Sequence, residues 1–191
     1  SSMRLSIVIP CLDEAAGILA TLQSLQPLRR NGHEVIIVDA GGDGTAEIAG
    51  PFADRVLRAP RGRAVQMNRG ATVATGDVLL FLHADTRLPP SAERSISEGL
   101  AASGRAWGRF DVRLSGRQPT LRVVEALINW RSRLTGIGTG DQAIFVTSGR
   151  FAGIGGFPEH LGGLRHDAQV VRVIRRHEEG AAKRVVLRPQ P

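Results

Sequence analysis

Residues 5–14 read L-S-I-V-I-P-C-L-D-E, an apolar run that ends in a proline and two carboxylates. Apart from Ser6, residues 5–9 are apolar and mostly β-branched, which is the pattern of a strand buried on both faces of a sheet. Pro10 ends this strand, and Asp13 can cap the helix that follows, because the apolar residues after it recur at helical spacing. We therefore predict a strand followed by a helix at the start of the chain.

The same alternation continues along the first half of the sequence. Apolar runs predict strands at residues 34–39, 55–58 and 78–82, and helical patterns predict a short helix from Asp43 and a longer one over residues 63–74. Strands that alternate with helices form a mostly parallel central sheet flanked by helices, so we predict an α/β domain. In such a sheet, ligands bind beyond the carboxyl ends of the strands, near the point where the strand order reverses.

The second half is less regular but belongs to the same predicted domain, which covers residues 3–191. The sequence contains no internal repeat, linker or low-complexity segment. A length of 191 residues is enough for one well-buried domain and too short for two. Helices are predicted at residues 89–102, 121–134, 150–154 and 163–176, and strands at residues 106–114, 143–146 and 184–187.

The composition excludes several classes of protein. A hydrophobic content of 42% is ordinary for a globular domain, and no apolar run reaches the about 18–20 residues needed to cross a membrane. The first residues show no secretory signal, so we expect a cytoplasmic protein. Cys11 is the only cysteine in the sequence, which excludes an intramolecular disulfide and a cysteine-built zinc site. We interpret it as a small packed residue.

The net charge of +7 raises the question of an anionic partner. The excess is concentrated near the end of the sequence, where residues 165–191 hold 7 basic and 3 acidic residues. The sequence has no tyrosine and only 4% aromatic residues, so it lacks the side chains on which nucleic-acid bases stack. We therefore expect no nucleic-acid partner.

Carboxylates follow the first two predicted strands. Asp13 and Glu14 come after the first strand, where they either cap a helix or accept hydrogen bonds from a ligand. Asp39 ends the second strand before a glycine-rich turn, and a carboxylate there suits a ribose hydroxyl or a base edge. The turn lacks the G-K-[ST] of a phosphate-binding loop and the G-x-G-x-x-G of dinucleotide-binding dehydrogenases, so the sequence disfavours both classes.

Two further segments carry polar residues that suit a phosphorylated ligand. Residues 61–71, R-G-R-A-V-Q-M-N-R-G-A, place Arg63 at the start of a helix, where it can bind a diphosphate, although an ordinary surface helix explains the same pattern. Residues 81–86, F-L-H-A-D-T, end a strand with His83 and Asp85 on one side. These two residues suit Mg²⁺ or Mn²⁺; the alternatives are an imidazole bonded to backbone and a carboxylate that caps a turn.

Taken in order, four segments resemble the family 2 glycosyltransferases, which have the GT-A fold and use nucleotide-sugar donors. The segments are P-C-L-D-E from residue 10, V-D-A-G-G-D-G-T from residue 38, G-R-A-V-Q-M-N-R-G-A from residue 62 and F-L-H-A-D-T from residue 81. The chain is most similar to a small bacterial subgroup marked by G-R-A-x-Q-M-N and L-H-A-D-T. The later segments G-D-Q-A-I-F-V and I-G-G-F-P, from residues 140 and 154, fit the same subgroup.

The resemblance implies a role for each matching residue. Asp85 would be the second aspartate of a D-x-D-like metal motif in which His83 replaces the first, and Mg²⁺ or Mn²⁺ there would stabilise the leaving diphosphate. The nucleotide-binding half would cover about residues 3–88, and the acceptor-side half about residues 89–191. The residues implied in nucleotide binding are Pro10, Asp13, Glu14, Asp39, Arg63 and Asn68.

The resemblance also points to a catalytic base. Inversion at the sugar carbon needs a carboxylate that deprotonates the acceptor hydroxyl. The family usually places Glu-Asp at the start of a helix after G-G-F-P, and the matching residues here are His166 and Asp167. Asp167 is therefore the predicted base, with Asp141 as the substitute if the register differs. Asp141 and Gln142 are also predicted to lie on the acceptor side.

Together these features predict an inverting glycosyltransferase that moves a sugar from a UDP- or GDP-linked donor to a hydroxyl acceptor. The missing glutamate leaves a second hypothesis open, a nucleotide-sugar-binding protein without turnover. A nucleotidyltransferase is disfavoured, because residues 10–14 lack a glycine-rich basic loop. The apolar stripe over residues 121–134 is either a core helix or an interfacial face for a lipid-linked acceptor at the inner membrane surface. A homodimer is left open as well.

Overall fold

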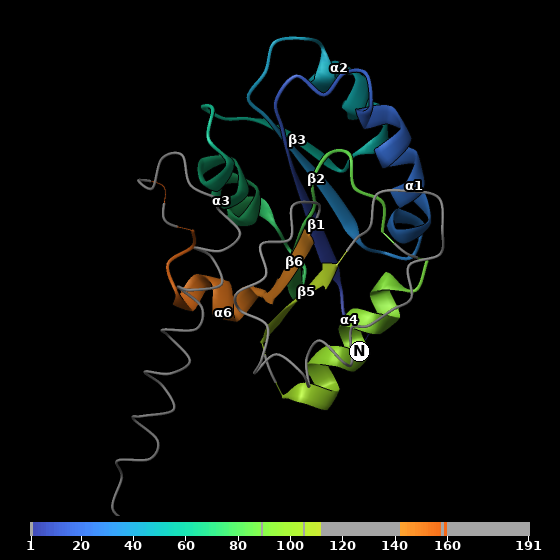
Figure 1. Cartoon of the computed structure of the whole chain (residues 1–191), viewed down its shortest axis with the longest axis vertical. Helices are drawn as coiled ribbons and strands as arrows, with labels where there is room; N and C mark the ends of the chain where they lie inside the picture. Colours follow the sequence, from blue (N-terminus) through green and yellow to red (C-terminus); the bar gives the residue numbers. More distant parts are fainter. Residues whose placement is uncertain (1, 89, 105, 112–141, 158, 160–191) are drawn as a thin grey trace, which may run out of the picture.

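A computed structural model describes residues 2–88, 90–104, 106–111, 142–157 and 159. These residues form a six-stranded sheet with helices on both faces (Figure 1). The strands lie in the order β3-β2-β1-β4-β6-β5. Their bounds are Leu5–Cys11 for β1, Glu34–Asp39 for β2, Arg55–Arg58 for β3, Val78–Phe81 for β4, Trp107–Asp111 for β5 and Gln142–Thr147 for β6.

β1 lies at the centre of the parallel part of the sheet. It pairs with β2 on one side, where Val8 lies opposite Ile36, and with β4 on the other, where Val8 lies opposite Phe81. β3 continues the parallel order beyond β2, whereas β6 runs antiparallel to both β4 and β5. The strand order therefore reverses between β1 and β4, which is where such sheets bind ligands at their carboxyl edge. The predicted mostly parallel α/β sheet is confirmed.

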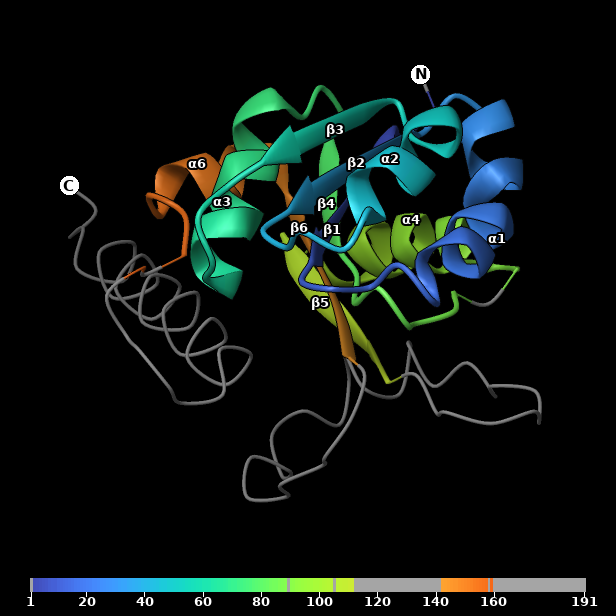
Figure 2. The ribbon, with the colours of Figure 1, turned by 90° about the horizontal axis from the view of Figure 1, so that it is seen from above.

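The described helices form two layers, which Figures 1 and 2 show from two sides. α1, α2 and α4 cover one face of the sheet, and α3 and α6 cover the other. None of these helices is long and apolar enough to cross a membrane. The bounds are Ile18–Arg30 for α1, Thr45–Ala49 for α2, Arg63–Val73 for α3, Ala92–Ser103 for α4 and Ser148–Gly153 for α6, with a 3-10 turn, η1, at Gly50–Phe52.

The two layers follow from the alternation of side chains along the strands. Leu5, Ile7 and Ile9 are buried in the core under α1, and Val8 is buried in the core under α3. Because successive side chains of a strand point to opposite faces, a continuous apolar run can fill both cores. α3 lies especially close to the sheet, since a Cβ on Gly70 would lie 2.4 Å from Val8 Cγ1. This close packing holds α3 against β1 and β2.

Two expectations about the end of β1 are wrong. Asp13 does not cap α1, which begins at Ile18, follows Gly17 and has no side-chain cap. Asp13 instead adopts a left-handed backbone conformation with φ 53°, and its Oδ1 accepts a long 3.4 Å hydrogen bond from the neighbouring loop. β1 also continues past Pro10, because a strand accepts proline where no ladder hydrogen bond requires an N–H.

The described part of the second half matches the prediction closely. α4 begins three residues after its predicted start, and β6 extends one residue beyond each predicted end. β5 lies within the predicted residues 106–114, and α6 begins two residues before its predicted start. The antiparallel direction of β6 was not predicted. The helices predicted at residues 121–134 and 163–176, and the strand at residues 184–187, lie outside the described residues.

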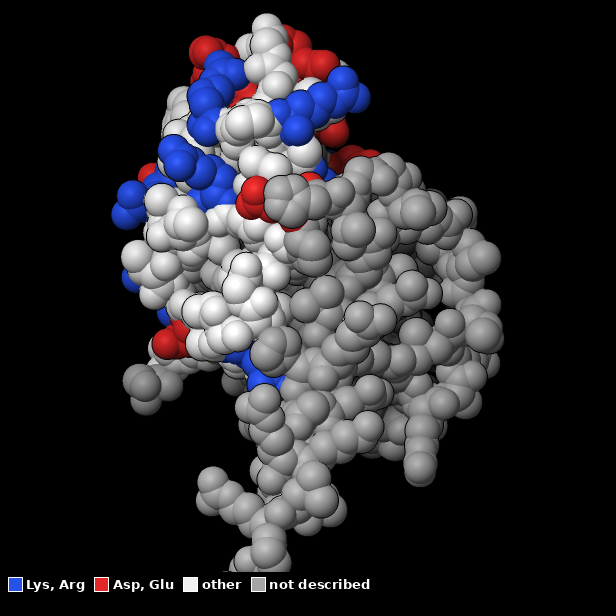
Figure 3. All heavy atoms as spheres, turned by 90° about the vertical axis from the view of Figure 1, so that its left-hand side faces the viewer, with Lys and Arg blue, Asp and Glu red and all other residues white. Residues whose placement is uncertain are grey.

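Charged side chains of both signs lie on the face that Figure 3 presents. In the upper part of this view, Lys and Arg atoms lie next to Asp and Glu atoms. Ion pairs have the same local character: Arg58 lies 3.0 Å from Asp39 and 3.2 Å from Glu47, and Arg29 lies 3.0 Å from Asp54. Basic and acidic side chains are thus interleaved in the upper part of this face.

Candidate functional site

The loops after β1 and β2 are joined at the carboxyl edge of the sheet. The backbone N–H of Glu14 donates to Thr45 Oγ1 at 3.0 Å. A Cβ on Gly41 would lie 2.5 Å from Asp13 Oδ1, so the two loops can approach this closely only with glycine at position 41. A left-handed backbone at a non-glycine residue such as Asp13 is costly and is often found at functional sites. The two loops therefore form one continuous rim.

Asp39 lies at the end of β2 with its carboxylate fully buried. Its Oδ1 accepts a hydrogen bond from the backbone N–H of Gly41 at 3.0 Å, and its Oδ2 accepts one from Arg58 Nη1 at the same distance. Arg58 Nη1 also donates to the Gly41 carbonyl at 2.7 Å, so the arginine closes over the carboxylate. Sequence reasoning missed Arg58, because its signal is the register that places it opposite Asp39 in β3.

The turn after β4 brings His83 and Asp85 to the same edge. The backbone N–H of Thr86 donates to the His83 carbonyl at 3.0 Å and closes the turn. Thr21 Oγ1 donates to the Ala84 carbonyl at 2.5 Å and ties the turn to α1. Ala84 is buried and Asp85 is exposed, so the aspartate side chain is accessible to a ligand.

Four carboxylates gather at this edge, and we call them the acidic rim: Asp13, Glu14, Asp43 and Asp85. Burial raises the pKa of the Glu14 carboxyl, and the negative charges of Asp85, Asp43 and Asp13 raise it further. These charges act on Glu14 because the loops after β1, β2 and β4 meet here. The acidic rim therefore favours cations and disfavours a diphosphate that arrives without a compensating positive charge.

Cys11 ends β1 close to the acidic rim but is buried. Burial, together with the negative charges of Asp39, Glu14 and Asp43, raises the pKa of the Cys11 thiol to about 12. The thiol therefore stays protonated at neutral pH, which makes it unreactive as a nucleophile. The interpretation of Cys11 as a small packed residue is confirmed.

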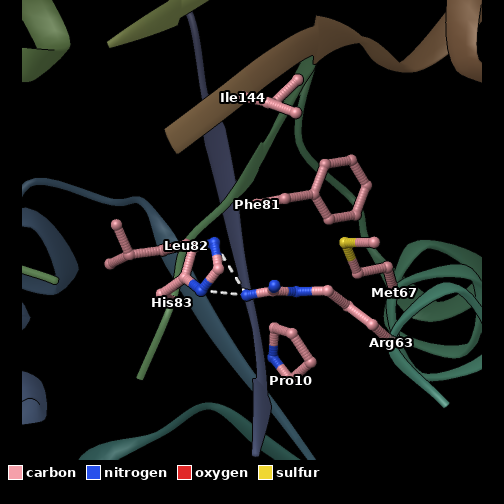
Figure 4. Close-up of a pocket in the computed structure, with 7 residues that line it drawn as sticks. All are labelled: Pro10, Arg63, Met67, Phe81, Leu82, His83 and Ile144. Carbon is pink, nitrogen blue, oxygen red and sulfur yellow. Dashed lines mark hydrogen bonds between the residues drawn. The ribbon is translucent and has the colours of Figure 1, made fainter. Parts of the chain in front are cut away.

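A small hollow, open to solvent, lies between β1, β4, β6 and α3 where the strand order reverses (Figure 4). Arg63 reaches into it from α3, and its Nη2 contacts both ring nitrogens of His83, with 2.7 Å to Nε2. The lining residues of the hollow are Pro10, Arg63, Met67, Phe81, Leu82, His83 and Ile144.

Gln66 joins the ends of two strands. Its buried side-chain amide donates from Nε2 to the Cys11 carbonyl at 2.8 Å and to the Val38 carbonyl at 2.9 Å. Both carbonyls lie at the carboxyl ends of their strands, next to Pro10 and Asp39. Gln66 therefore holds together the edge where the predicted nucleoside-binding residues lie. The only signal for this role in the sequence is a glutamine among the apolar residues of a predicted helix.

Asn68 uses its side-chain amide inside the protein. Its Nδ2 donates to the Phe157 carbonyl at 2.9 Å and to Glu159 Oε1 at 2.8 Å, and its Oδ1 accepts from the Phe157 N–H at 2.8 Å. Gly156, with φ 79°, permits this approach, because a Cβ there would lie 2.8 Å from Asn68 Oδ1. The amide thus holds the turn after α6 against α3, and a role for Asn68 in nucleotide binding stays a prediction.

The predicted metal and acceptor-side residues are only partly described. Among the residues that the structure describes, no group of three His, Cys, Asp or Glu side chains could hold a metal ion. Asp85 nevertheless offers an exposed carboxylate, a suitable ligand for Mg²⁺ or Mn²⁺. Gln142 is the first residue of β6, paired with Asp111, whereas Asp141 and Asp167 lie outside the described residues.

The sequence of this domain matches a known family. Residues 6–155 match the model of glycosyl transferase family 2. The chain belongs to that family. A PGL/p-HBAD biosynthesis glycosyltransferase of Mycobacterium bovis is 40% identical over 91 residues, which cover 44% of this chain and 36% of that protein. The uncharacterized glycosyltransferase YibD of Escherichia coli is 33% identical over 98 residues, 48% of this chain and 28% of YibD. The chain matches about a third of the length of these curated relatives.

Solved structures of glycosyltransferases have the same fold as this family 2 chain. S. aureus TarS 1–349 has a TM-score of 0.66 at 14% identity and covers 90% of this chain and 55% of its own. The Pyrobaculum calidifontis mannosyltransferase PcManGT has a TM-score of 0.60 at 21% identity, with 85% and 49% covered. Mycobacterium tuberculosis glucosyl-3-phosphoglycerate synthase has a TM-score of 0.55 at 21% identity, with 78% and 58% covered. The predicted GT-A fold is confirmed, and membership of the small subgroup stays a prediction.

Proposed function

We propose that this chain binds a nucleotide-sugar donor at the carboxyl edge of its sheet and transfers the sugar, with inversion, to a hydroxyl acceptor. The observation that carries the proposal is the meeting of the polar loops after β1, β2 and β4 with Arg63 where the strand order reverses. Proteins of the same fold support it: TarS forms a complex with UDP-GlcNAc, and PcManGT forms one with GDP-Man and Mn²⁺.

The loops after β1 and β2 would bind the nucleoside. Pro10 and Asp13 would line the pocket, with Glu14 beside them, and the Asp39 carboxylate would accept hydrogen bonds from a base or ribose. Arg58 closes over Asp39, so a nucleoside reaches this carboxylate only when the arginine turns outward. The Arg58 side chain is 55% exposed, which gives it room to do so.

The loop after β4 would hold the divalent ion. The exposed Asp85 carboxylate suits Mg²⁺ or Mn²⁺, and the acidic rim favours a cation. A bound ion would act as a Lewis acid that stabilises the negative charge of the leaving diphosphate. The assignment of His83 as a second ligand stays a prediction, because both of its ring nitrogens lie against Arg63.

The acceptor side would supply the base. We propose that Asp167 takes the proton from the acceptor hydroxyl. The hydroxyl oxygen then attacks the sugar carbon as the bond between that carbon and the nucleoside diphosphate breaks. Asp141 and Gln142 would lie beside the acceptor. A lipid-linked acceptor, a place at the inner membrane surface and a homodimer stay predictions, as does the division into halves at about residue 88.

Calorimetry with UDP and GDP, each with and without Mn²⁺, tests donor binding. Asp85→Asn should lower the Mn²⁺-dependent affinity at least about tenfold, because a direct ligand is lost. Glu98→Gln is the matched control, since it removes an exposed carboxylate from α4. Failure to bind either nucleotide would refute the proposal.

Product formation from UDP- and GDP-sugars separates transfer from binding alone. A chain that binds the donor but neither transfers nor hydrolyses its sugar would be the non-catalytic binding protein that the altered base motif leaves open. Release of the sugar by the wild-type chain, and its loss in the variant Asp167→Asn, would support turnover through the predicted base.

A further inference from the structure

The turn after β4 is held from α1 by a buried side chain. Thr21 lies at the end of the first turn of α1 and is 2% exposed, and its Oγ1 donates to the Ala84 carbonyl at 2.5 Å. Ala84 is itself buried and lies between His83 and Asp85, the two predicted metal residues. The hydrogen bond therefore acts on the backbone from which the Asp85 carboxylate extends.

The bond of Thr21 differs from the one that is usual for a hydroxyl in a helix. Serine and threonine hydroxyls inside a helix commonly donate to a carbonyl three or four residues earlier in the same helix. The hydroxyls of Ser24 and Thr72 do so, since they donate to the carbonyls of Thr21 at 2.6 Å and of Arg69 at 2.7 Å. Thr21 instead donates across the core to a segment 63 residues away, so its hydroxyl joins two elements rather than stabilising its own helix.

The same turn of α1 is joined to the acidic rim. The Glu14 carbonyl accepts from the N–H groups of Gly17 and Ile18 at 3.1 and 2.9 Å, so the loop after β1 leads directly into the helix. Burial, and then the negative charge of Asp85, raise the pKa of the Glu14 carboxyl, so the two carboxylates lie near each other. A bond that fixes α1 relative to the turn after β4 therefore also fixes the distance between Glu14 and Asp85.

A divalent ion depends on such a fixed position of its ligands. Mg²⁺ accepts oxygen ligands only in a narrow geometry, and partners that orient a ligand change the metal affinity when they are removed. The Asp85 side chain is exposed, so its position depends on how the backbone of its turn is held. The Thr86 N–H closes this turn on the His83 carbonyl at 3.0 Å, and Thr21 holds the carbonyl in between.

We propose that Thr21 is a positioning residue for the divalent ion, because it holds the turn after β4 so that Asp85 lies beside the acidic rim. The inference rests on the proposed donor site and deepens it. It adds a residue of α1 that is buried and therefore contacts neither the nucleotide nor the ion. α1 thus connects the loop that would bind the nucleoside with the turn that would bind the ion.

Mn²⁺ binding in the presence of UDP or GDP, followed by electron paramagnetic resonance, tests this role. Thr21→Val keeps the shape of the side chain but removes the hydroxyl, and it should weaken Mn²⁺ binding about tenfold. Thr21→Ala removes the hydroxyl without placing a methyl group against the carbonyl, and it should weaken Mn²⁺ binding to the same extent. Thr21→Ser restores the donor and should retain most of the wild-type affinity.

Thr86→Val is the matched control. Thr86 is also buried and lies in the same turn, but its Oγ1 has no hydrogen-bond partner in the part of the chain that the structure describes. Removal of this hydroxyl breaks no bond, so Mn²⁺ binding should be unchanged. Thermal unfolding shows whether each variant is folded.

Two further measurements separate positioning from a purely structural role. Calorimetry with UDP and GDP in EDTA measures the affinity without metal, which Thr21→Val should leave unchanged. Hydrogen exchange measures the opening of the turn, because the Thr86 amide donates to the His83 carbonyl. This amide should exchange faster in Thr21→Val than in the wild-type chain and in Thr21→Ser.

The outcomes distinguish this inference from the proposed function. Wild-type Mn²⁺ binding in Thr21→Val, an equal loss in Thr86→Val, or equal losses of nucleotide affinity in EDTA and in Mn²⁺ would overturn the inference and leave donor binding intact. The same holds for a wild-type chain that binds a nucleotide but no Mn²⁺. A wild-type chain that binds neither UDP nor GDP, with or without Mn²⁺, would overturn both.

Discussion

Replacement of Gln66 by methionine tests whether this side chain holds the carboxyl edge together. Methionine has nearly the same length and fits an apolar surrounding, but it cannot donate to the carbonyls of Cys11 and Val38, which accept at 2.8 and 2.9 Å. A buried hydrogen bond contributes about 0.5–1.5 kcal/mol net. The Cys11 carbonyl keeps a second donor, the N–H of Ala40 at 3.0 Å, so its loss falls at the low end. We expect a total loss of about 1–2 kcal/mol in the free energy of unfolding.

Urea unfolding of Gln66→Met beside Gln26→Met measures this loss. Gln26 also donates twice from Nε2, to the carbonyls of Leu22 and Phe52 at 2.9 Å, but it is half-buried, so water can replace the lost bonds. The control should therefore change the free energy of unfolding by no more than about 0.5 kcal/mol. Equal losses of unfolding free energy in the two variants, or no loss in Gln66→Met, would show that the buried hydrogen bonds of Gln66 do not stabilise the carboxyl edge. Either result would refute the reasoning.

Two further substitutions test the packing and the electrostatics of the sheet. Gly70→Ala should lower the free energy of unfolding by about 1–3 kcal/mol, because its Cβ would lie 2.4 Å from Val8 Cγ1. The control Gly149→Ala, whose Cβ would have no atom within 4 Å, should be neutral or stabilising. Chemical denaturation of both variants measures the difference. Burial alone would raise the pKa of the buried Glu34 carboxyl, but hydrogen bonds from Ser6 and Thr75 hold it below its ordinary value of 4.5. A lowered pKa stabilises the fold above its ordinary value, and this stabilisation is lost as the pH falls through the folded pKa. Glu34→Gln should therefore lower the melting temperature at about pH 7, and the difference from the wild-type chain should shrink steadily as the pH falls below 4.5. A melting-temperature difference that does not depend on pH would contradict this assignment.

The strands of the parallel half could be predicted because their burial pattern is simple. β1, β2 and β4 are covered on both faces, so each is a continuous apolar run that local sequence reveals. The polar residues at their ends could be placed at one edge for the same reason, since all three strands run in the same direction. The antiparallel direction of β6 could not be predicted, because it depends on the path of the chain through the second half.

Contacts between segments that lie far apart in the chain could not be predicted from the sequence. Arg58 closes over Asp39 only because the register of β3 places the two residues opposite each other. The local sequence allowed Asp13 to act as a helix cap. In the structure, Asp13 instead lies against Gly41 of the neighbouring loop in a left-handed backbone conformation. Local propensity describes what a residue can do next to its neighbours in the chain, whereas these residues are held by neighbours in space.

The polar residues of G-R-A-V-Q-M-N show how far spacing alone can reach. At about 100° per residue, Gln66 lies about 60° from Arg63 around α3, and Asn68 lies about 140° from it. Arg63 and Gln66 therefore share the side of the helix that faces the carboxyl edge, and Asn68 faces the turn after α6. The resemblance places both Arg63 and Asn68 on the donor; their side chains leave the helix in different directions, and the role of Asn68 in nucleotide binding stays a prediction. α3 thus has three roles. Arg63 faces the hollow, Gln66 binds the ends of β1 and β2, and Asn68 holds the turn after α6.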